Sequence, residues 1–222
     1  MAPSVDGRIV TRRWPVPGGI ISSEYERTAT SLGGDAWIIG RVSMEPYAGK
    51  GRVSVRSGRT RIRRTDFIAR EDATSYAIAI DPSGKLRWKS GFIDEDHVVT
   101  VLTDRVSERY LGFLRDQGVS YLFAGRDRID IPGLLQKLRD RLGIGRLLLE
   151  GGGKINGSFL AADCIDEVSI LFAPVADGSV GTPALFDAPD GTVAARRLQL
   201  VSVERRSGDL LWVRYHVRHE RP

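Results

Sequence analysis

Cysteine and histidine are scarce in this chain of 222 residues, which holds the single cysteine Cys164 and three histidines. One cysteine excludes an intramolecular disulfide framework, and a chain of this length can bury a core without one. Such cysteine usage is typical of a reducing compartment, so we expect the protein in the cytoplasm. Cys164 lies beside Ile165 ahead of an apolar stretch, and we interpret it as a core thiol. The scattered histidines lack metal-ligand spacing, so no metal site is predicted.

Long hydrophobic runs are also absent. Hydrophobic residues make up 41% of the chain, but no stretch approaches the roughly 20 apolar residues of a membrane helix. Residues 1–8 lack the apolar core of a signal peptide. We find no repeat, low-complexity tract or linker. The sequence therefore predicts one soluble globular domain over residues 1–222.

Positive charge exceeds negative charge by +5 and is concentrated in one basic segment. Its arginines are Arg52, Arg56, Arg59, Arg61, Arg63, Arg64 and Arg70. Three interpretations stay open: a solvated loop, a contact with a phosphorylated ligand or partner subunit, and a nucleic-acid interface. No aromatic residue interleaves with the arginines before Phe67, which argues against a stacking platform for single strands.

Hydrophobic periodicity predicts strands and helices that alternate along the chain. Strands are expected at residues 5–10, 36–39, 75–80, 97–102, 119–124, 146–150 and 168–172. Helices are expected after caps at Ser22 or Ser23, at Ser107 and at Asp130. Residues 198–205 and 210–217 predict an antiparallel hairpin. The pattern indicates an α/β fold with a mostly parallel central sheet, helices on both faces and an antiparallel C-terminal hairpin.

A glycine-rich turn is the most informative motif. The apolar residues 147–149 end in Glu150, and Gly151, Gly152 and Gly153 follow before a predicted helix. Helix starts carry unpaired N–H groups and partial positive charge, and glycine lets an anion approach the backbone. The motif predicts a pocket for a nucleotide pyrophosphate. Its spacing matches neither G-x-x-x-x-G-K-[ST] nor G-x-G-x-x-G.

Polar residues or glycine also follow three other predicted strands. Gly40, Arg41 and Ser43 follow the strand at 36–39, Asp81 follows the strand at 75–80, and Thr103 and Arg105 follow the strand at 97–102. The carboxyl ends of parallel strands form one edge of a sheet, where ligands bind in open α/β folds. These positions strengthen the prediction of a nucleotide site.

Several of these stretches resemble a known family. Ser4-Val5-Asp6-Gly7-Arg8 resembles the S-x-D-G-[KR] opening of the riboflavin-biosynthesis reductase family, also called the RibD C-terminal domain. A second signature of that family is similar to Leu148-Leu149-Glu150-Gly151-Gly152, Phe159-Leu160, Asp166-Glu167, Ala173-Pro174 and Gly178. Gly40-Arg41-Val42-Ser43-Met44-Glu45 is similar to the G-R-x-T-x-E turn of the wider dihydrofolate-reductase-like fold. The resemblance runs from Ser4 to about Gly178.

The resemblance implies an NADPH-dependent reductase with the three-layer dihydrofolate-reductase-like fold. Its substrate would be a ribosylamino-pyrimidine of riboflavin biosynthesis, 5-amino-6-(5-phosphoribosylamino)uracil or its diamino analogue. Hydride would pass from the nicotinamide to C1′ of the opened sugar imine. A homodimer is also implied, and the apolar residues 210–213 indicate an edge strand that needs cover.

The resemblance also implies roles for the cofactor-site residues. The pyrophosphate would be held by Gly151, Gly152, Gly153, Lys154 and Ile155, with Glu150 beside them. Arg41 and Ser43, after Gly40, would lie near the adenosine phosphates, and Asp81 at the same edge. Thr103 and Arg105 would bind the 2′-phosphate, since a guanidinium can hold phosphate with two bonds. Arg105 as a surface residue at a helix start remains an alternative.

At the substrate end the resemblance implies Ser4, Asp6, Trp14 and Glu24. Asp6 and Glu150 are the expected catalytic carboxylates, because imine reduction needs a proton as well as a hydride. Structural alternatives stay open for three of them: a turn for Asp6, loop packing for Trp14, and a first-turn glutamate that stabilises the helix dipole for Glu24.

The chain also departs from the family. It lacks the H-x-E and P-C-x-x-C motifs of the zinc deaminase that often precedes the reductase domain. The loop at residues 12–17 and the turn after Gly40 are atypical. Three alternatives therefore remain: a reductase of another heterocycle such as a pterin or dihydrofolate, a basic nucleic-acid-binding protein, and a regulator that binds NADPH without turnover.

Overall fold

The computed structural model describes residues 1–49, 62–188 and 193–219. The chain divides into two compact units. Unit 1 comprises Met1–Gly33 and Glu150–Pro222, and unit 2 comprises Gly34–Leu149. Four arginines of the basic segment, Arg52, Arg56, Arg59 and Arg61, lie outside the described residues.

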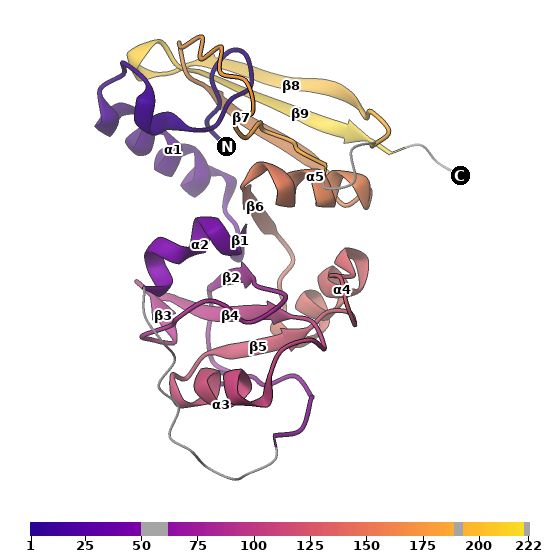
Figure 1. Cartoon of the computed structure of the whole chain (residues 1–222). Coiled ribbons are helices and arrows are strands. Elements are labelled where there is room, and N and C mark those ends of the chain that lie inside the picture. Colours follow the sequence, from indigo (N-terminus) through magenta and orange to yellow (C-terminus); the bar gives the residue numbers. More distant parts are fainter. Residues whose placement is uncertain (50–61, 189–192, 220–222) are drawn as a thin grey trace. The chain divides into compact units, whose positions relative to one another are not determined.

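Unit 2 is built on the central sheet (Figure 1). Its strands are β1 (Ala36–Gly40), β2 (Tyr76–Ile80), β3 (Phe92–Ile93), β4 (Asp96–Leu102), β5 (Ser120–Phe123) and β6 (Leu147–Gly151), of which the last two residues belong to unit 1. The order is β3-β4-β2-β1-β6, and β5 also pairs with β4. β1, β2, β4 and β5 pair in parallel, whereas the short β3 is antiparallel to β4. The predicted mostly parallel sheet is confirmed, while β3 had no predicted counterpart.

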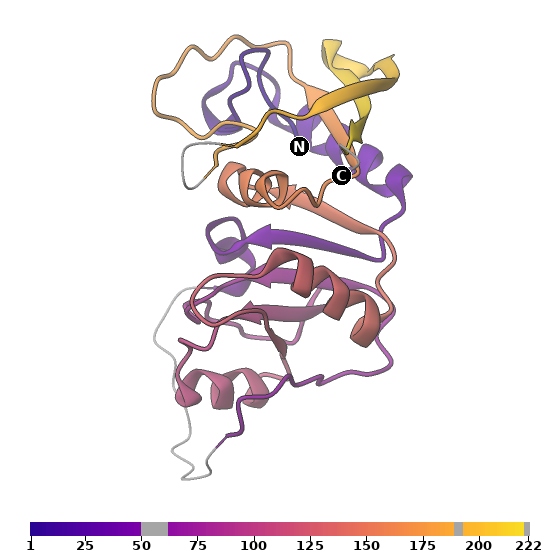
Figure 2. The same cartoon turned by 90° about the vertical axis from the view of Figure 1, so that its right-hand side faces the viewer.

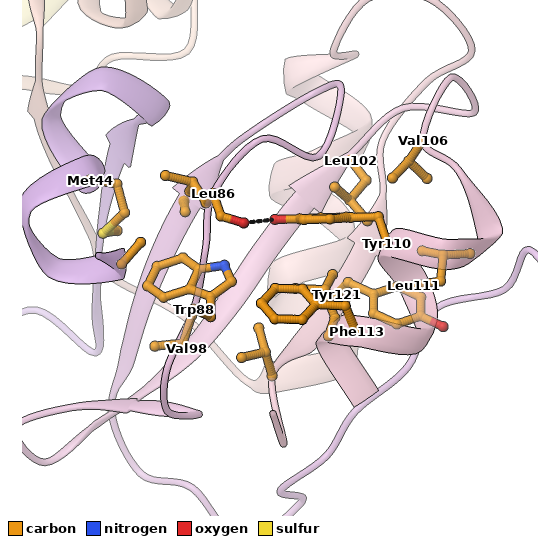
Figure 3. Packing of buried hydrophobic residues seen from close by; sticks show 14 of the residues in the cluster. Met44, Leu86, Trp88, Val98, Leu102, Val106, Tyr110, Leu111, Phe113 and Tyr121 are labelled. Atoms are coloured by element: carbon orange, nitrogen blue, oxygen red, sulfur yellow. Dashed lines mark hydrogen bonds between the residues drawn. The ribbon is translucent and has the colours of Figure 1, made fainter. Parts of the chain in front are cut away.

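The helices of unit 2 are α2 (Arg41–Ala48), α3 (Glu108–Asp116) and α4 (Ile131–Leu142). α2 and α3 pack on the same side of the sheet, where Met44, Tyr110 and Leu111 join one buried cluster with Leu86 and Trp88 (Figure 3). α4 crosses the sheet on its other side (Figure 2). Since both sides are covered, every residue of β2 is buried.

The predicted caps of α3 and α4 are confirmed. The Ser107 hydroxyl accepts a hydrogen bond from the N–H of Tyr110, and the Asp130 carboxylate accepts one from the N–H of Gly133. Such side chains satisfy N–H groups that a helix start leaves unpaired.

Unit 1 contains a second, antiparallel sheet. Its elements are η1 (Thr11–Arg13), α1 (Gly18–Leu32), α5 (Gly153–Ala161), β7 (Glu167–Phe172), β8 (Arg197–Arg205), η2 (Ser207–Asp209) and β9 (Leu211–Arg218). The strand order is β7-β9-β8. A buried cluster joins α1 to this sheet through Ile21, Leu171 and Trp212. The predicted hairpin is confirmed, but β9 is the central strand, so the expectation that residues 210–213 form an edge is wrong. The strands at the two edges are β7 and β8.

Three local predictions near the N-terminus and β1 are wrong. Residues 5–10 form turns, with one isolated bridge at Arg8, because Gly7 has a φ of +83°. α1 begins at Gly18 after Pro17 rather than at a serine cap, and the Ser22 and Ser23 hydroxyls donate back to carbonyls of the preceding turn. The turn expected after Gly40 is the first turn of α2.

Candidate functional site

The glycine motif folds as predicted into the end of β6 and the start of α5. Gly151 has a φ of +95°, a backbone conformation that residues other than glycine rarely adopt. The Gly151–Gly152 peptide bond is cis. Gly152 is the N-cap of α5, and no side chain caps this helix. Lys154 is exposed at the first turn. Within the part of the chain that the structure describes, the first backbone N–H groups of α5 thus have no side-chain cap.

Loop residues 182–188 lie tightly against the glycine face of α5. A Cβ added at Gly153 would lie 2.1 Å from the Ala184 carbonyl oxygen. One added at Gly157 would lie 2.4 Å from the Asp187 carbonyl oxygen. Asp187 donates its N–H to the Gly153 carbonyl at 2.9 Å. Gly153 and Gly157 thus serve packing of unit 1, which is a role that the sequence did not predict.

Ser4 and Asp6 meet in the N-terminal turn. Asp6 Oδ1 accepts hydrogen bonds from Ser4 Oγ at 2.8 Å and from the Asp177 N–H at 2.9 Å, and Oδ2 accepts one from the Gly178 N–H at 2.9 Å. These donors, the Asp177 amide first, hold the pKa of the Asp6 carboxyl well below its usual range. The side chain is therefore an ionised acceptor near neutral pH and a poor proton donor.

Trp14 is held by the same region. Its Nε1 donates to Asp177 Oδ2 at 2.6 Å, Arg13 lies 3.2 Å from Oδ1 of that carboxylate, and the Trp14 side chain is 8% exposed. The Ser179 hydroxyl and Trp14 lower the pKa of Asp177. Sequence reasoning missed Asp177, although it lies directly before Gly178 of the second signature. A short acidic residue before a turn glycine is the pattern that could have identified it.

Glu24 and Glu150 are the other two predicted carboxylates of unit 1. Glu24 is 2% exposed, and its Oε1 pairs with Arg27 at 2.8 Å. Its Oε2 is buried without a hydrogen-bond partner in the described structure. No acidic residue lies in the first turn of α1, so the first-turn interpretation of Glu24 is wrong. Glu150 lies half-buried in β6. Its charge partly offsets the burial that lowers the pKa of the Met1 amino group to about 6.

In unit 2 the predicted residues gather at the carboxyl edge of the sheet. Gly40 at the end of β1 pairs with Ile80 at the end of β2. Asp81, the residue after Ile80, therefore lies close to the end of β1. Gly40 is the N-cap of α2, and no side chain caps this helix either. Arg41 pairs with Glu45, and Ser43 is exposed.

Asp81 is fully buried and organises the loop that follows β2. Its Oδ2 accepts hydrogen bonds from the N–H of Lys85 at 2.6 Å, the N–H of Leu86 at 2.8 Å and the Tyr110 hydroxyl at 3.2 Å. Burial, and then the Asp81 charge, raise the pKa of Tyr110. Thr103, also fully buried, donates its N–H and its hydroxyl to the Pro82 carbonyl at 3.0 and 2.7 Å. Both side chains thus bind loop backbone.

Arg105 is an exposed cation at this edge, and its Nε lies 2.9 Å from Asp127 Oδ1. Two arginines of the basic segment have partners within unit 2. Arg64 donates to backbone carbonyls, and Arg70 pairs with Asp72 at 2.9 Å. Among the described residues, no group of three or more histidine, cysteine, aspartate or glutamate side chains is placed to hold a metal ion. In the same residues no helix has both the length and the apolar character for a membrane span.

Comparison with known proteins identifies relatives in several organisms. A 2,5-diamino-6-ribosylamino-4(3H)-pyrimidinone 5′-phosphate reductase of Methanothermobacter thermautotrophicus is 39% identical over 79 residues, 35% of this chain and 36% of that protein. The reductase of that name from Aquifex aeolicus is 30% identical over 91 residues, 41% of this chain and 40% of that protein. The chain thus spans about two fifths of these curated relatives.

Solved structures and a family model extend the likeness to almost the whole chain. A pyrimidine reductase-like protein of Corynebacterium diphtheriae has a TM-score of 0.68 at 18% identity, over 99% of this chain and 90% of that chain. This likeness shows the fold. Residues 1–212 match the family model described as the RibD C-terminal domain. Since that match covers nearly all of the sequence, the chain belongs to the RibD C-terminal domain family.

Proposed function

We propose that this chain is an NADPH-dependent reductase that converts the ribosylamino group of a pyrimidine ribose phosphate into a ribitylamino group, a step of riboflavin biosynthesis. The family membership and the names of the two reductase relatives support this function. The observation that carries it is the glycine turn between β6 and α5, which ends in a helix start without a side-chain cap.

Two helix starts, each taken by itself, offer backbone N–H groups of the kind that bind phosphate. α3 and α4 are capped by Ser107 and Asp130, whereas α2 and α5 follow Gly40 and Gly152 and have no side-chain cap. Backbone N–H groups at such starts are suited to phosphate oxygens. NADPH, when bound, would supply the hydride. The protein's own residues would orient the dinucleotide and control charge around it.

The cofactor roles follow from exposure and contacts. Gly151, Gly152, Gly153, Lys154 and Ile155 would hold the pyrophosphate, and Gly40, Arg41 and Ser43 would lie near the adenosine phosphates. Arg105 is the exposed group for the 2′-phosphate. Asp81 and Thr103 would act through the loops that they hold, because both are fully buried.

At the substrate end the three carboxylates have different surroundings, and we assign them different roles. Asp6, kept ionised by its three donors, would accept hydrogen bonds or fix the turn together with Ser4. The buried, unpartnered Oε2 of Glu24 would accept a hydrogen bond from an amino or hydroxyl group of the substrate. Glu150 would supply the proton. Trp14 would support this end through Asp177.

We further propose that residues 1–222 act as one reductase domain, in the cytoplasm, and as a homodimer. All nine residues of the edge strand β8 are at least partly exposed, and the apolar Leu198, Leu200, Val201 and Val203 are among them. A long apolar edge strand is a template for pairing with another chain. A second copy placed antiparallel, with Leu200 opposite Val201, would set Arg197 opposite Glu204 at both ends.

The test is a titration of the purified chain with NADPH and NADH, followed by nicotinamide absorbance after addition of the pyrimidine ribosylamine phosphate. We expect NADPH binding and substrate-dependent oxidation. Glu150→Gln should lower kcat by about a hundredfold or more with little change in NADPH affinity, while Glu26→Gln, on the exposed side of α1, should leave both unchanged. Binding without oxidation would redirect the search to other heterocycles, and no binding would contradict the proposal.

A further inference from the structure

The loop that follows β4 carries Arg105 and is tied down from several directions. Thr103 anchors its start on the Pro82 carbonyl. Asp104 donates its N–H at 3.2 Å to the Gly125 carbonyl in the loop after β5. Val106, at its end, is 1% exposed in the core of unit 2. Between these anchors, only the Arg105 side chain extends into solvent as a cation.

Arg64 closes this loop from a distant part of the chain. Its Nη1 donates to the Asp104 carbonyl and its Nη2 to the Val106 carbonyl, both at 2.8 Å. The two acceptors flank Arg105 on either side. A planar guanidinium can serve two fixed acceptors at once, whereas an ammonium is a point charge on a flexible stem. The Arg64 guanidinium therefore bridges the backbone of the residues that present Arg105.

The side chain of Arg105 has weaker support. Its ion pair with Asp127 joins two side chains that are 70% and 60% exposed, and such pairs contribute only about 0–1 kcal/mol. The direction of the Arg105 side chain is thus set mainly by its backbone. That backbone is held by Arg64.

We propose that Arg64 is a positioning residue for Arg105 and thereby determines the preference of this protein for a 2′-phosphorylated dinucleotide over an unphosphorylated one. The inference rests on the proposed function, in which Arg105 binds the 2′-phosphate. It assigns a role to the basic segment that is neither nucleic-acid binding nor mere solvation.

The experiment measures the Kd of the full chain for NADP⁺ and NAD⁺ by calorimetry. In Arg64→Ala we expect the Kd for NADP⁺ to rise about three- to tenfold, as for loss of roughly 1 kcal/mol, and the Kd for NAD⁺ to stay unchanged. Arg64→Lys should behave like Arg64→Ala, because lysine keeps the charge but cannot bridge both carbonyls. Arg63→Ala removes a neighbouring exposed arginine and should match the wild type.

Three results would overturn the proposal. Wild-type affinity in Arg64→Lys would show that only the charge of Arg64 matters. If Arg64→Ala weakens the binding of both dinucleotides equally, Arg64 has a general structural role. If the wild type does not prefer NADP⁺, there is no preference for Arg64 to determine. The proposed substrate fails separately from this inference. If the chain binds NADP⁺ selectively, loses that selectivity in Arg64→Ala and does not oxidise NADPH with the pyrimidine substrate, the substrate is another heterocycle and the inference is still supported.

Discussion

One buried histidine makes the stability of this protein depend on pH. His97 in β4 is fully buried, and its Nε2 lies 2.7 Å from Ser120 Oγ. Burial lowers the pKa of the His97 imidazole from its ordinary 6.5, and the charge of Arg70 acts in the same direction, while a Gly91 carbonyl and Asp72 oppose it. The unfolded chain therefore takes up a proton at a higher pH than the folded chain does.

This shift predicts a loss of stability in acid. The free energy of unfolding should keep the His97 contribution above about pH 6.5 and lose it as the pH falls below that value. Urea denaturation at about pH 7.5 and about pH 5.5 measures the difference. His97→Gln should reduce it, whereas His216→Gln, at an exposed position of β9, should preserve it. An unchanged pH dependence in His97→Gln would contradict the prediction.

At the scale of elements, the close approach of residues 182–188 to α5 sets a steric limit. Added Cβ atoms at Gly153 and Gly157 would lie 2.1 and 2.4 Å from backbone oxygens, so the backbone must shift. We expect Gly153→Ala and Gly157→Ala each to lower the free energy of unfolding by about 1–3 kcal/mol. Chemical denaturation checks this.

Gly19→Ala provides the matched control. Gly19 also lies in a helix, but a Cβ there would meet no atom within 4 Å. Alanine should leave stability unchanged or raise it by about 0.5–1 kcal/mol. Equal free energies of unfolding for Gly153→Ala and Gly19→Ala would show that residues 182–188 move away from α5 without loss of stability.

Elements that depend on local chemistry were predictable, and those that depend on distant partners were not. The caps at Ser107 and Asp130 and the strands of the parallel sheet follow from neighbouring residues. Residues 5–10 carry a strand-like apolar pattern, but Asp6 bonds to amides at Asp177 and Gly178, which no local pattern reveals. At the site, the glycine turn was visible in sequence. The hydrogen bond from Arg64 to the Asp104 carbonyl beside Arg105 joins residues 40 positions apart, and the sequence did not predict it.

At the scale of the whole molecule, the exposed edge strand β8 predicts assembly. Leu200 and Val203 are each 55% exposed on a strand whose outer edge pairs with no other strand among the described residues. If two copies pair there, a charge at these positions would be placed in the apolar centre of the interface and would disfavour association. Leu200→Lys and Val203→Lys should therefore convert a dimer into a monomer in analytical ultracentrifugation. Val180→Lys, at a residue that is 96% exposed elsewhere in unit 1, should remain dimeric.

The charges at the ends of β8 test the register of this pairing. With Leu200 opposite Val201, Arg197 faces Glu204 of the second copy at both ends of the interface. Arg197→Glu would oppose two carboxylates at each end and should weaken the dimer, because directly opposed like charges destabilise paired strands. Combining Arg197→Glu with Glu204→Arg restores opposite signs and should recover the dimer. A dimer that survives Leu200→Lys, or a double variant no tighter than Arg197→Glu alone, would place the contact on another surface or in another register.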